Sequence, residues 1–173
     1  RAPSNVTITA SKVNKTDIIN SLPADLSVIT ANGTTKANYD GALIYASDLE
    51  GKITKINLTG NFNLNSDNIL TNVSSTTLFN AQSTSENGRY IYTRPEVTIN
   101  NDNNLWLYFG TGNTQKLHEQ SNKIKNRLYG IKDTDFPQYS NISTPGDISK
   151  CKTSPDCPQP NDQGWYIDLQ NYQ

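Results

Sequence analysis

The sequence predicts an all-β fold of short strands and long loops, arranged as propeller-like blades. Only 34% of the 173 residues are hydrophobic and 18% are charged, and Asn, Thr and Ser dominate the rest. These small polar residues bond to nearby backbone and favour turns over helices. Tyr and Trp stand in short runs with Ile, Val and Leu, which a disordered chain would lack. Two such runs, residues 43–47 and 106–110, resemble each other and are roughly 60 residues apart, which indicates repeated blades with loop insertions.

The first third of the chain shows no helical periodicity, apart from one candidate helical turn within residues 17–29 that Pro23 interrupts. We therefore divide the sequence into an N-terminal irregular or β segment, residues 1–39, and a blade segment, residues 40–173. The chain contains no Met and opens on Arg1, which is typical of a processed or excised piece of a larger protein.

The clearest pattern is a hairpin that follows Asp40. Residues 41–47 are typical of a buried strand, residues 48–51 of a turn, and residues 52–58 alternate as a half-exposed strand does. Gly51 supplies the positive φ that such a turn needs. Asp48 opens the turn, where an Asp more often accepts bonds from local backbone amides than binds a ligand.

Further short strands are predicted along the rest of the chain. They cover residues 69–70, 77–79, 90–93, 96–99, 105–110, 127–131 and 165–169. Residues 105–110 are apolar on both faces and are predicted to form a central strand. Residues 100–104 are a predicted turn, residues 115–125 a short helix or ordered loop, and most of residues 133–163 a loop.

The composition excludes several classes of function. The net charge is -1 and no stretch combines Lys and Arg with aromatics, so nucleic-acid binding is not expected. No apolar run approaches the roughly 20 residues that a transmembrane helix needs. Cys151 and Cys157 lack the spacing of a zinc pair, and we expect a disulfide that pins a surface loop in an oxidising compartment, with two free thiols as the alternative.

Catalytic patterns are weak. His118, the single histidine, lies among Gln, Lys and Glu in a predicted surface segment, so a Ser-His-Asp site is not expected. Asp133 and Asp135 form a candidate carboxylate pair, but the neighbouring Lys and Pro favour a solvated turn. The Gly110-Thr111-Gly112 sequence is not a phosphate loop, because no helix with Lys-Ser/Thr follows it.

Four stretches in a fixed order resemble the PilC/PilY proteins, which are tip-associated factors of bacterial type IV pili with a C-terminal β-propeller. The first, residues 45–52, resembles a blade strand and its turn. Residues 93–97 are similar to the family's Thr-Arg-Pro strand, residues 106–112 to its Tyr-Phe-Gly-Thr-Gly motif, and residues 126–133 to the strand that follows. The resemblance covers roughly residues 40–135. It implies that Asp48, Gly51, Arg94, Gly110 and Gly112 shape the blades.

One departure from that family concerns calcium. Many members carry a loop of alternating Asp and Asn ligands just before the strand that residues 45–49 resemble. Here Asn38 and Asp40 keep part of that alternation, and apolar residues replace the later Asp. Calcium commonly takes 6–8 oxygen ligands. No cofactor is therefore assigned, and calcium at Asn38 and Asp40 stays the open candidate.

The resemblance implies a non-enzymatic role in pilus assembly or retraction, in adhesion and in virulence. The expected partners are minor pilins at the pilus tip and a host-cell or abiotic surface, and the expected location is the bacterial surface, at the pilus tip or outer membrane. Two alternatives remain open. One is a quinone-dependent dehydrogenase, whose propellers share the Tyr-x-x-Asp-x-x-Gly hairpin, and the other is a carbohydrate-binding β module, which loops rich in Asn, Asp and Trp suit.

Overall fold

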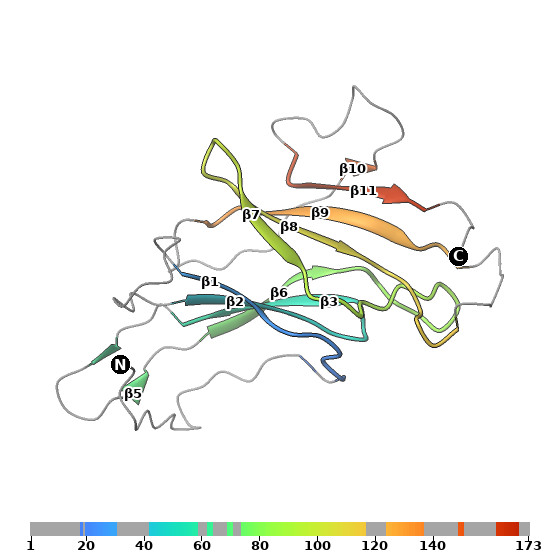
Figure 1. The fold of residues 1–173 in the computed structure, drawn as a ribbon, viewed down its shortest axis with the longest axis horizontal. Coiled ribbons are helices and arrows are strands. Elements are labelled where there is room, and N and C mark those ends of the chain that lie inside the picture. Colours follow the sequence, from blue (N-terminus) through green and yellow to red (C-terminus); the bar gives the residue numbers. More distant parts are fainter. Residues whose placement is uncertain are drawn as a thin grey trace.

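A computed structural model describes residues 18, 20–30, 42–58, 62–63, 69–70, 74–116, 124–136, 149–150 and 162–169. Within these ranges the chain forms eleven strands and no helix (Figure 1). The described residues therefore contain no helix that is long and apolar enough to cross a membrane.

The first sheet is a four-stranded antiparallel meander. Its strands lie in the order β1 (Ser27–Thr30), β2 (Ala42–Ser47), β3 (Lys52–Asn57) and β6 (Ser74–Asn80). A register shift between Ile53 and Thr54 bends the pairing of β3 with β6. The insertion between β3 and β6 contains β4 (Phe62–Asn63) and β5 (Ile69–Leu70), which pair only with each other.

The second sheet repeats this plan. Its strands β7 (Glu96–Ile99), β8 (Leu105–Gly110), β9 (Arg127–Asp133) and β11 (Gly164–Asp168) are neighbours in that order and pair antiparallel. The two-residue β10 (Ser149–Lys150) adds to the far edge, parallel to β11. Each sheet is completed before the next begins, and no described strand crosses from one sheet to the other.

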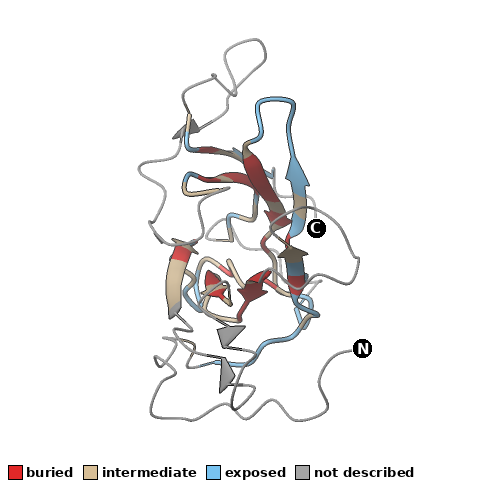
Figure 2. Ribbon diagram, turned by 90° about the vertical axis from the view of Figure 1, so that its left-hand side faces the viewer, coloured by how far each residue is buried: buried red, intermediate tan, exposed pale blue. Residues whose placement is uncertain are grey.

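The two sheets pack face to face around one core. The core consists of buried side chains from both sheets (Figure 2). The first sheet contributes Leu43, Tyr45 and Ile53, and the second sheet contributes Leu105, Leu107, Phe109, Tyr129 and Ile131. Phe79 of β6 reaches across the interface, with its ring 4.9 Å from that of Tyr129 and 5.7 Å from that of Phe109. Burial of such apolar surface is the main force that holds the sheets together.

The first strand of each sheet lies beside the first strand of the other. β1 and β7 are edge strands that contact one another. The hydroxyl of Ser27 donates a hydrogen bond to the carbonyl of Pro95, just before β7. The hydroxyl of Ser47 likewise donates to the carbonyl of Thr93, at 2.9 Å. The sheets thus approach one another at this edge as well as through their faces.

The all-β expectation is confirmed, and the two similar runs in the sequence occupy the same place in their sheets. Residues 43–47 lie in β2 and residues 106–110 in β8, each the second strand of its meander. The hairpin after Asp40, the short strand at residues 69–70, the turn at residues 100–104 and the strand at residues 165–168 are also present. The described strands do not close into a ring. β1 shows that the first sheet begins before residue 40.

Two local predictions are wrong. Residues 90–93 form no strand but run as the connector between the two sheets. Their alternation arises because Ile91 points into the core while Tyr90 and Tyr92 are only half-buried. The described residues within 17–29 form no helical turn: residues 27–29 lie in β1 instead.

The strand predicted at residues 52–58 is present, but its polar residues are not the exposed ones, since Thr54, Lys55 and Asn57 are all buried. Ile53 and Ile56 are three residues apart, so they point to opposite faces of β3. The face that Ile53 shares with Lys55 and Asn57 is buried against the core, and Lys55 lies there fully enclosed. A lysine in that position needs a partner, because an unpaired charge is very costly to bury.

Candidate functional site

The turn between β2 and β3 is built by Asp48, as the sequence predicts. One carboxylate oxygen of Asp48 accepts hydrogen bonds from the backbone N–H groups of Glu50 (2.9 Å) and Lys52 (3.0 Å). The other oxygen is shielded from solvent and finds no hydrogen-bond partner within the described part of the chain. Burial therefore raises the pKa of the Asp48 carboxyl, and the two backbone hydrogen bonds offset only part of that rise.

Gly51 closes this turn and lets a second loop approach closely. Its φ is +75°, and a Cβ placed on it would lie 2.6 Å from the backbone oxygen of Arg89. The backbone oxygen of Gly51 accepts a hydrogen bond of 2.8 Å from the N–H of Ala81. Glycine meets both requirements here, the left-handed backbone and the absence of a side chain.

The loop that approaches Gly51 is residues 81–90, which leaves β6. Gln82 holds a left-handed conformation (φ 54°), and its N–H donates to the Asn80 side chain at 2.7 Å. Asn87 braces the loop from within, because its side-chain oxygen accepts from the N–H groups of Thr84 (2.9 Å) and Arg89 (3.0 Å). Its side-chain amide donates to the carbonyl of Gln82 at 2.8 Å. The loop is thus ordered by its own polar side chains.

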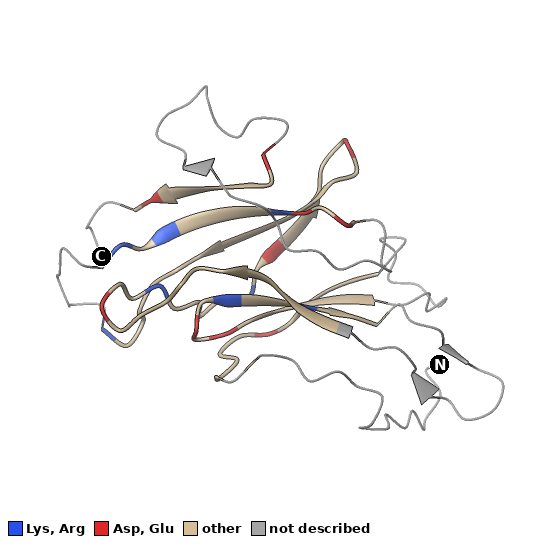
Figure 3. Ribbon diagram, turned by 180° about the vertical axis from the view of Figure 1, so that it is seen from behind, with Lys and Arg blue, Asp and Glu red and all other residues tan. Residues whose placement is uncertain are grey.

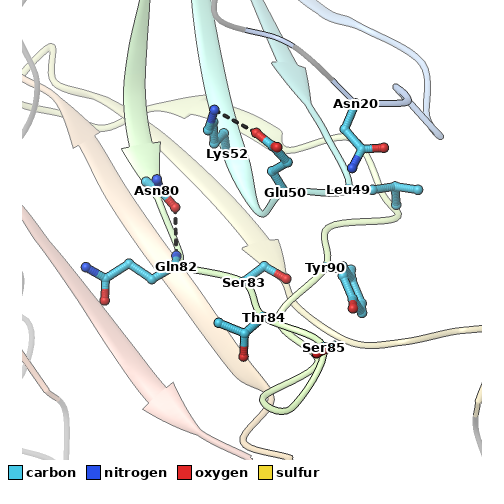
Figure 4. A pocket seen from close by; sticks show the side chains of 10 residues that line it. All are labelled: Asn20, Leu49, Glu50, Lys52, Asn80, Gln82, Ser83, Thr84, Ser85 and Tyr90. Carbon is cyan, nitrogen blue, oxygen red and sulfur yellow. Dashed lines mark hydrogen bonds and ion pairs between the residues drawn. The ribbon is translucent and has the colours of Figure 1, made fainter.

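Between the β2–β3 turn and the loop of residues 81–90 lies an open hollow of about 480 Å³ (Figure 4). Glu50 and Lys52 form one wall, Ser83 lies opposite, and Tyr90 stands at the side. The full lining comprises Asn20, Leu49, Glu50, Lys52, Asn80, Gln82, Ser83, Thr84, Ser85 and Tyr90. Leu49 ties the preceding segment to the turn, since its N–H donates to the carbonyl of Ser21 at 3.2 Å.

The hollow carries both charges but no excess of either. Glu50 and Lys52 pair with each other at 2.7 Å, and their side chains are 27% and 16% exposed. Acidic and basic residues are interspersed along the rest of the described strands and turns (Figure 3). The hollow is therefore suited to a ligand without net charge.

A buried ionic cluster joins the two sheets and was missed from the sequence. The Lys55 ammonium of β3 lies 2.9 and 2.7 Å from the two carboxylate oxygens of Asp133, at the end of β9, and both side chains are 0% exposed. Tyr45 of β2 donates its hydroxyl to Asp133 at 2.6 Å. The expected solvated turn at Asp133 is thus wrong. The neighbouring Lys and Pro favour exposure, but β9 continues to Asp133 and places that side chain in the core.

The other residues assigned to blade shaping lie at or just beyond the ends of strands of the second sheet: Arg94 precedes β7, Gly110 ends β8 and Gly112 follows it. Arg94 is exposed and weakly paired, with its Nε 3.6 Å from the Glu96 carboxylate. Gly110 ends β8, and the N–H of Gly112 donates to the carbonyl of Tyr90 at 2.9 Å. A Cβ on Gly112 would meet only the Asn126 side chain, at 3.7 Å. Gly112 thus connects the second sheet to the side of the hollow, while Arg94 does not reach it.

Several predicted residues fall outside the described ranges. These are Asn38 and Asp40, the calcium candidates, Cys151 and Cys157, the disulfide candidates, and His118. Within the described residues, no three His, Cys, Asp or Glu side chains gather as metal ligands would. The turn at residues 100–104 is held by Asn100, whose side-chain oxygen accepts from the N–H groups of Asp102 and Asn104.

Both tryptophans lie in the second sheet, on the face turned away from the core. The ring of Trp106 stacks on that of Tyr108 at 6.3 Å, and Tyr108 lies 6.0 Å from Trp165. The Trp165 ring covers Gly130, where an added Cβ would come within 2.5 Å of it. These rings pack along the sheet and do not line the hollow.

No protein-family model, curated protein or solved structure matches this chain.

Proposed function

We propose that the chain is a propeller-type segment of a type IV pilus tip-associated adhesin and assembly or retraction factor, which works by binding and not by catalysis. One observation carries this proposal. The stretches that resemble the PilC/PilY family occupy matching places in two successive meanders. Residues 45–52 contribute to the second and third strands of the first sheet and the turn between them, and residues 106–110 and 127–133 lie in the second and third strands of the second sheet.

The strand connections favour propeller blades over a sandwich. In most sandwiches the chain crosses between the sheets in Greek-key connections. Here four strands of each sheet form an antiparallel meander, as in a propeller blade. The pair β4 and β5 is inserted before β6, and β10 adds to the edge of the second sheet. The contact between β1 and β7 also supports this reading, because the first strands of neighbouring blades lie side by side around a propeller axis.

A binding role fits the distribution of rigid and polar parts. The sheets bury a core of large apolar residues and an ion pair between them, whereas the turns and loops at their ends carry Asn, Gln, Ser and Thr. Binding residues commonly lie on loops that a rigid scaffold positions. The proposed contact region is the hollow between the β2–β3 turn and residues 81–90. The proposed partners are minor pilins and a host-cell or abiotic surface, at the bacterial cell surface.

The test is a chromosomal deletion of residues 20–169 in the bacterium that encodes the chain. Surface pili and adherent cells are counted in the same cultures, with the restored full-length gene as the control. We expect fewer pili, or a normal number of pili with reduced adherence, and the two patterns separate an assembly role from an adhesive one. Unchanged pili and adherence, with the shortened protein still exported, would refute the proposal.

A further inference from the structure

We propose that the hollow between the β2–β3 turn and residues 81–90 is a binding site for a neutral saccharide. The inference rests on the proposed binding function and adds the class of ligand. Seven of the ten lining residues carry amide or hydroxyl side chains: Asn20, Asn80, Gln82, Ser83, Thr84, Ser85 and Tyr90. Amides and hydroxyls both donate and accept hydrogen bonds, as the hydroxyls of a sugar do.

The charge of the site argues for a neutral ligand. Lys52 is the one basic residue in the lining, and Glu50 neutralises it at 2.7 Å. A phosphorylated or sulfated ligand would need an Arg or Lys free to pair with it. Arg89 lies behind the loop, where its guanidinium donates to the carbonyls of Lys125 (3.2 Å) and Ala81 (3.5 Å). No cationic side chain of the described residues is therefore directed to an anion in the hollow.

The apolar part of the lining suits the C–H face of a sugar ring. Tyr90 stands at one side of the hollow and Leu49 at the rim above it (Figure 4). An aromatic ring combines a flat apolar face with a polar end, which is what a ligand with hydroxyls at its edge requires. A lipid or another apolar ligand would instead need a predominantly hydrophobic pocket.

The walls are preorganised. Asn87 holds the loop through four hydrogen bonds to its own residues, and Gln82 is kept at a φ of 54°. Left-handed residues other than glycine are uncommon and concentrate at functional sites. A loop that is already ordered loses little conformational entropy when a ligand binds.

One lining hydroxyl has an unmet hydrogen-bonding capacity. The Ser83 Oγ is shielded from solvent and finds no partner among the described residues. Such groups are rare in native proteins and call for a structural or functional reason. Ser83 faces the Glu50–Lys52 wall across the hollow, so a small rotation of its side chain directs the hydroxyl to a ligand there.

The test is a titration of the ¹⁵N-labelled chain with lactose, maltose and N,N′-diacetylchitobiose, followed by amide chemical shifts. The matched comparator is 3′-sialyllactose, which adds one carboxylate-bearing sugar to lactose. We expect saturable shifts in residues 49–52 and 80–90 with at least one neutral disaccharide, and a dissociation constant on the order of 1 mM, as for a shallow site.

Two variants locate the site. Tyr90→Ala removes the ring and should weaken binding about tenfold, the equivalent of one lost aromatic contact. Ser85→Trp places a large side chain at an exposed lining position. It should abolish binding by filling the hollow, and it leaves the packing of the core unchanged. Tyr108→Ala, an aromatic truncation on the outer face of the second sheet, is the matched control and should leave the affinity unchanged.

Three outcomes would overturn the inference: no shift with any neutral disaccharide, binding of 3′-sialyllactose without lactose, or shifts that Ser85→Trp leaves intact. These results are independent of the pilus assay. Loss of adherence on deletion combined with no saccharide binding would reject the ligand class alone. Saccharide binding combined with unchanged pili and adherence would reject the pilus role and leave the site.

Discussion

The buried cluster of Lys55, Asp133 and Tyr45 gives the sharpest prediction for stability. Lys55→Met keeps the length and most of the volume of the side chain but removes its charge. Asp133 then stays in the core, where the Tyr45 hydroxyl at 2.6 Å and the N–H of Asp135 at 3.2 Å still donate to its carboxylate. Removing one member of a buried ion pair costs about 3–5 kcal/mol, because the other charge is left uncompensated.

A second variant separates charge from packing. Lys55→Met combined with Asp133→Asn leaves no buried charge, and the Asn side chain still accepts the Tyr45 hydroxyl. We expect the double variant to recover at least half of the loss, since neutral replacement of a whole buried pair is often nearly free. Tyr45→Phe, which removes one hydrogen bond to a charged group, should cost about 1.5–3 kcal/mol.

Urea unfolding is the assay, with tryptophan fluorescence and circular dichroism recorded together. Trp106 and Trp165 report on the second sheet, and circular dichroism on both sheets. In thermal unfolding, each kcal/mol that Lys55→Met loses should lower the Tm by about 2–4 °C in a chain of this size. Two results would show that the pair does not hold the sheets together. One is a loss of unfolding free energy below about 1 kcal/mol in Lys55→Met. The other is a loss in the double variant that equals the sum of the losses in Lys55→Met and Asp133→Asn measured separately.

Three further predictions concern single residues. Gly51→Ala should destabilise the chain by about 1–3 kcal/mol in urea unfolding, because the Cβ would meet the Arg89 oxygen and φ is positive, whereas Gly112→Ala should change it by less than about 1 kcal/mol. Gly130→Ala should displace the Trp165 ring and shift the fluorescence maximum to the red, and an unchanged spectrum would contradict the close contact. The folded-state pKa of Asp48 is raised, so its carboxylate destabilises the fold above that pKa, and this cost disappears as the pH falls below the unfolded-state value. As the pH falls from 7 to 3, the wild type should therefore gain unfolding free energy relative to Asp48→Asn. If urea unfolding gives the same difference between the two proteins at every pH, the raised pKa of Asp48 is refuted.

Local chemistry explains which parts of the fold are predictable from the sequence. The hairpin of β2 and β3 follows from an apolar run, an Asp that caps the turn and a glycine with positive φ, all within about a dozen residues. β8 follows from six residues that are apolar on both faces, as a central strand requires. Residues 90–93 show the limit of this reasoning, because a connector that buries one side chain in every two produces the same alternation as a strand.

The central polar interactions depend on contacts that no local pattern carries. Lys55 and Asp133 are 78 residues apart, and each taken alone is a charged residue near a turn, where exposure is the ordinary expectation. The sequence does hold one clue to the burial of Lys55. Side chains of a regular strand alternate between its two faces, so Lys55 must share a face with Ile53, and either the lysine is buried or the strand is irregular. The hollow was missed for a similar reason, because its lining combines Asn20, the β2–β3 turn and residues 80–90, which only the folded chain brings together.

The way in which the hollow is anchored suggests how the specificity of the proposed binding site can change while its shape is kept. The loop of residues 81–90 is fixed to the first sheet by the hydrogen bond from the Ala81 N–H to the Gly51 carbonyl, and to the second by that from the Gly112 N–H to the Tyr90 carbonyl. Both bonds join backbone atoms, so replacing the side chains of Ser83 or Ser85 leaves them in place. Thr84 and Asn80 are different, because their side-chain oxygens accept hydrogen bonds from the N–H groups of Asn87 and Gln82 and so also hold the wall. Substitutions at Ser83 or Ser85 should therefore alter which ligand the proposed site prefers with little effect on stability, whereas substitutions at Gly51 should affect both.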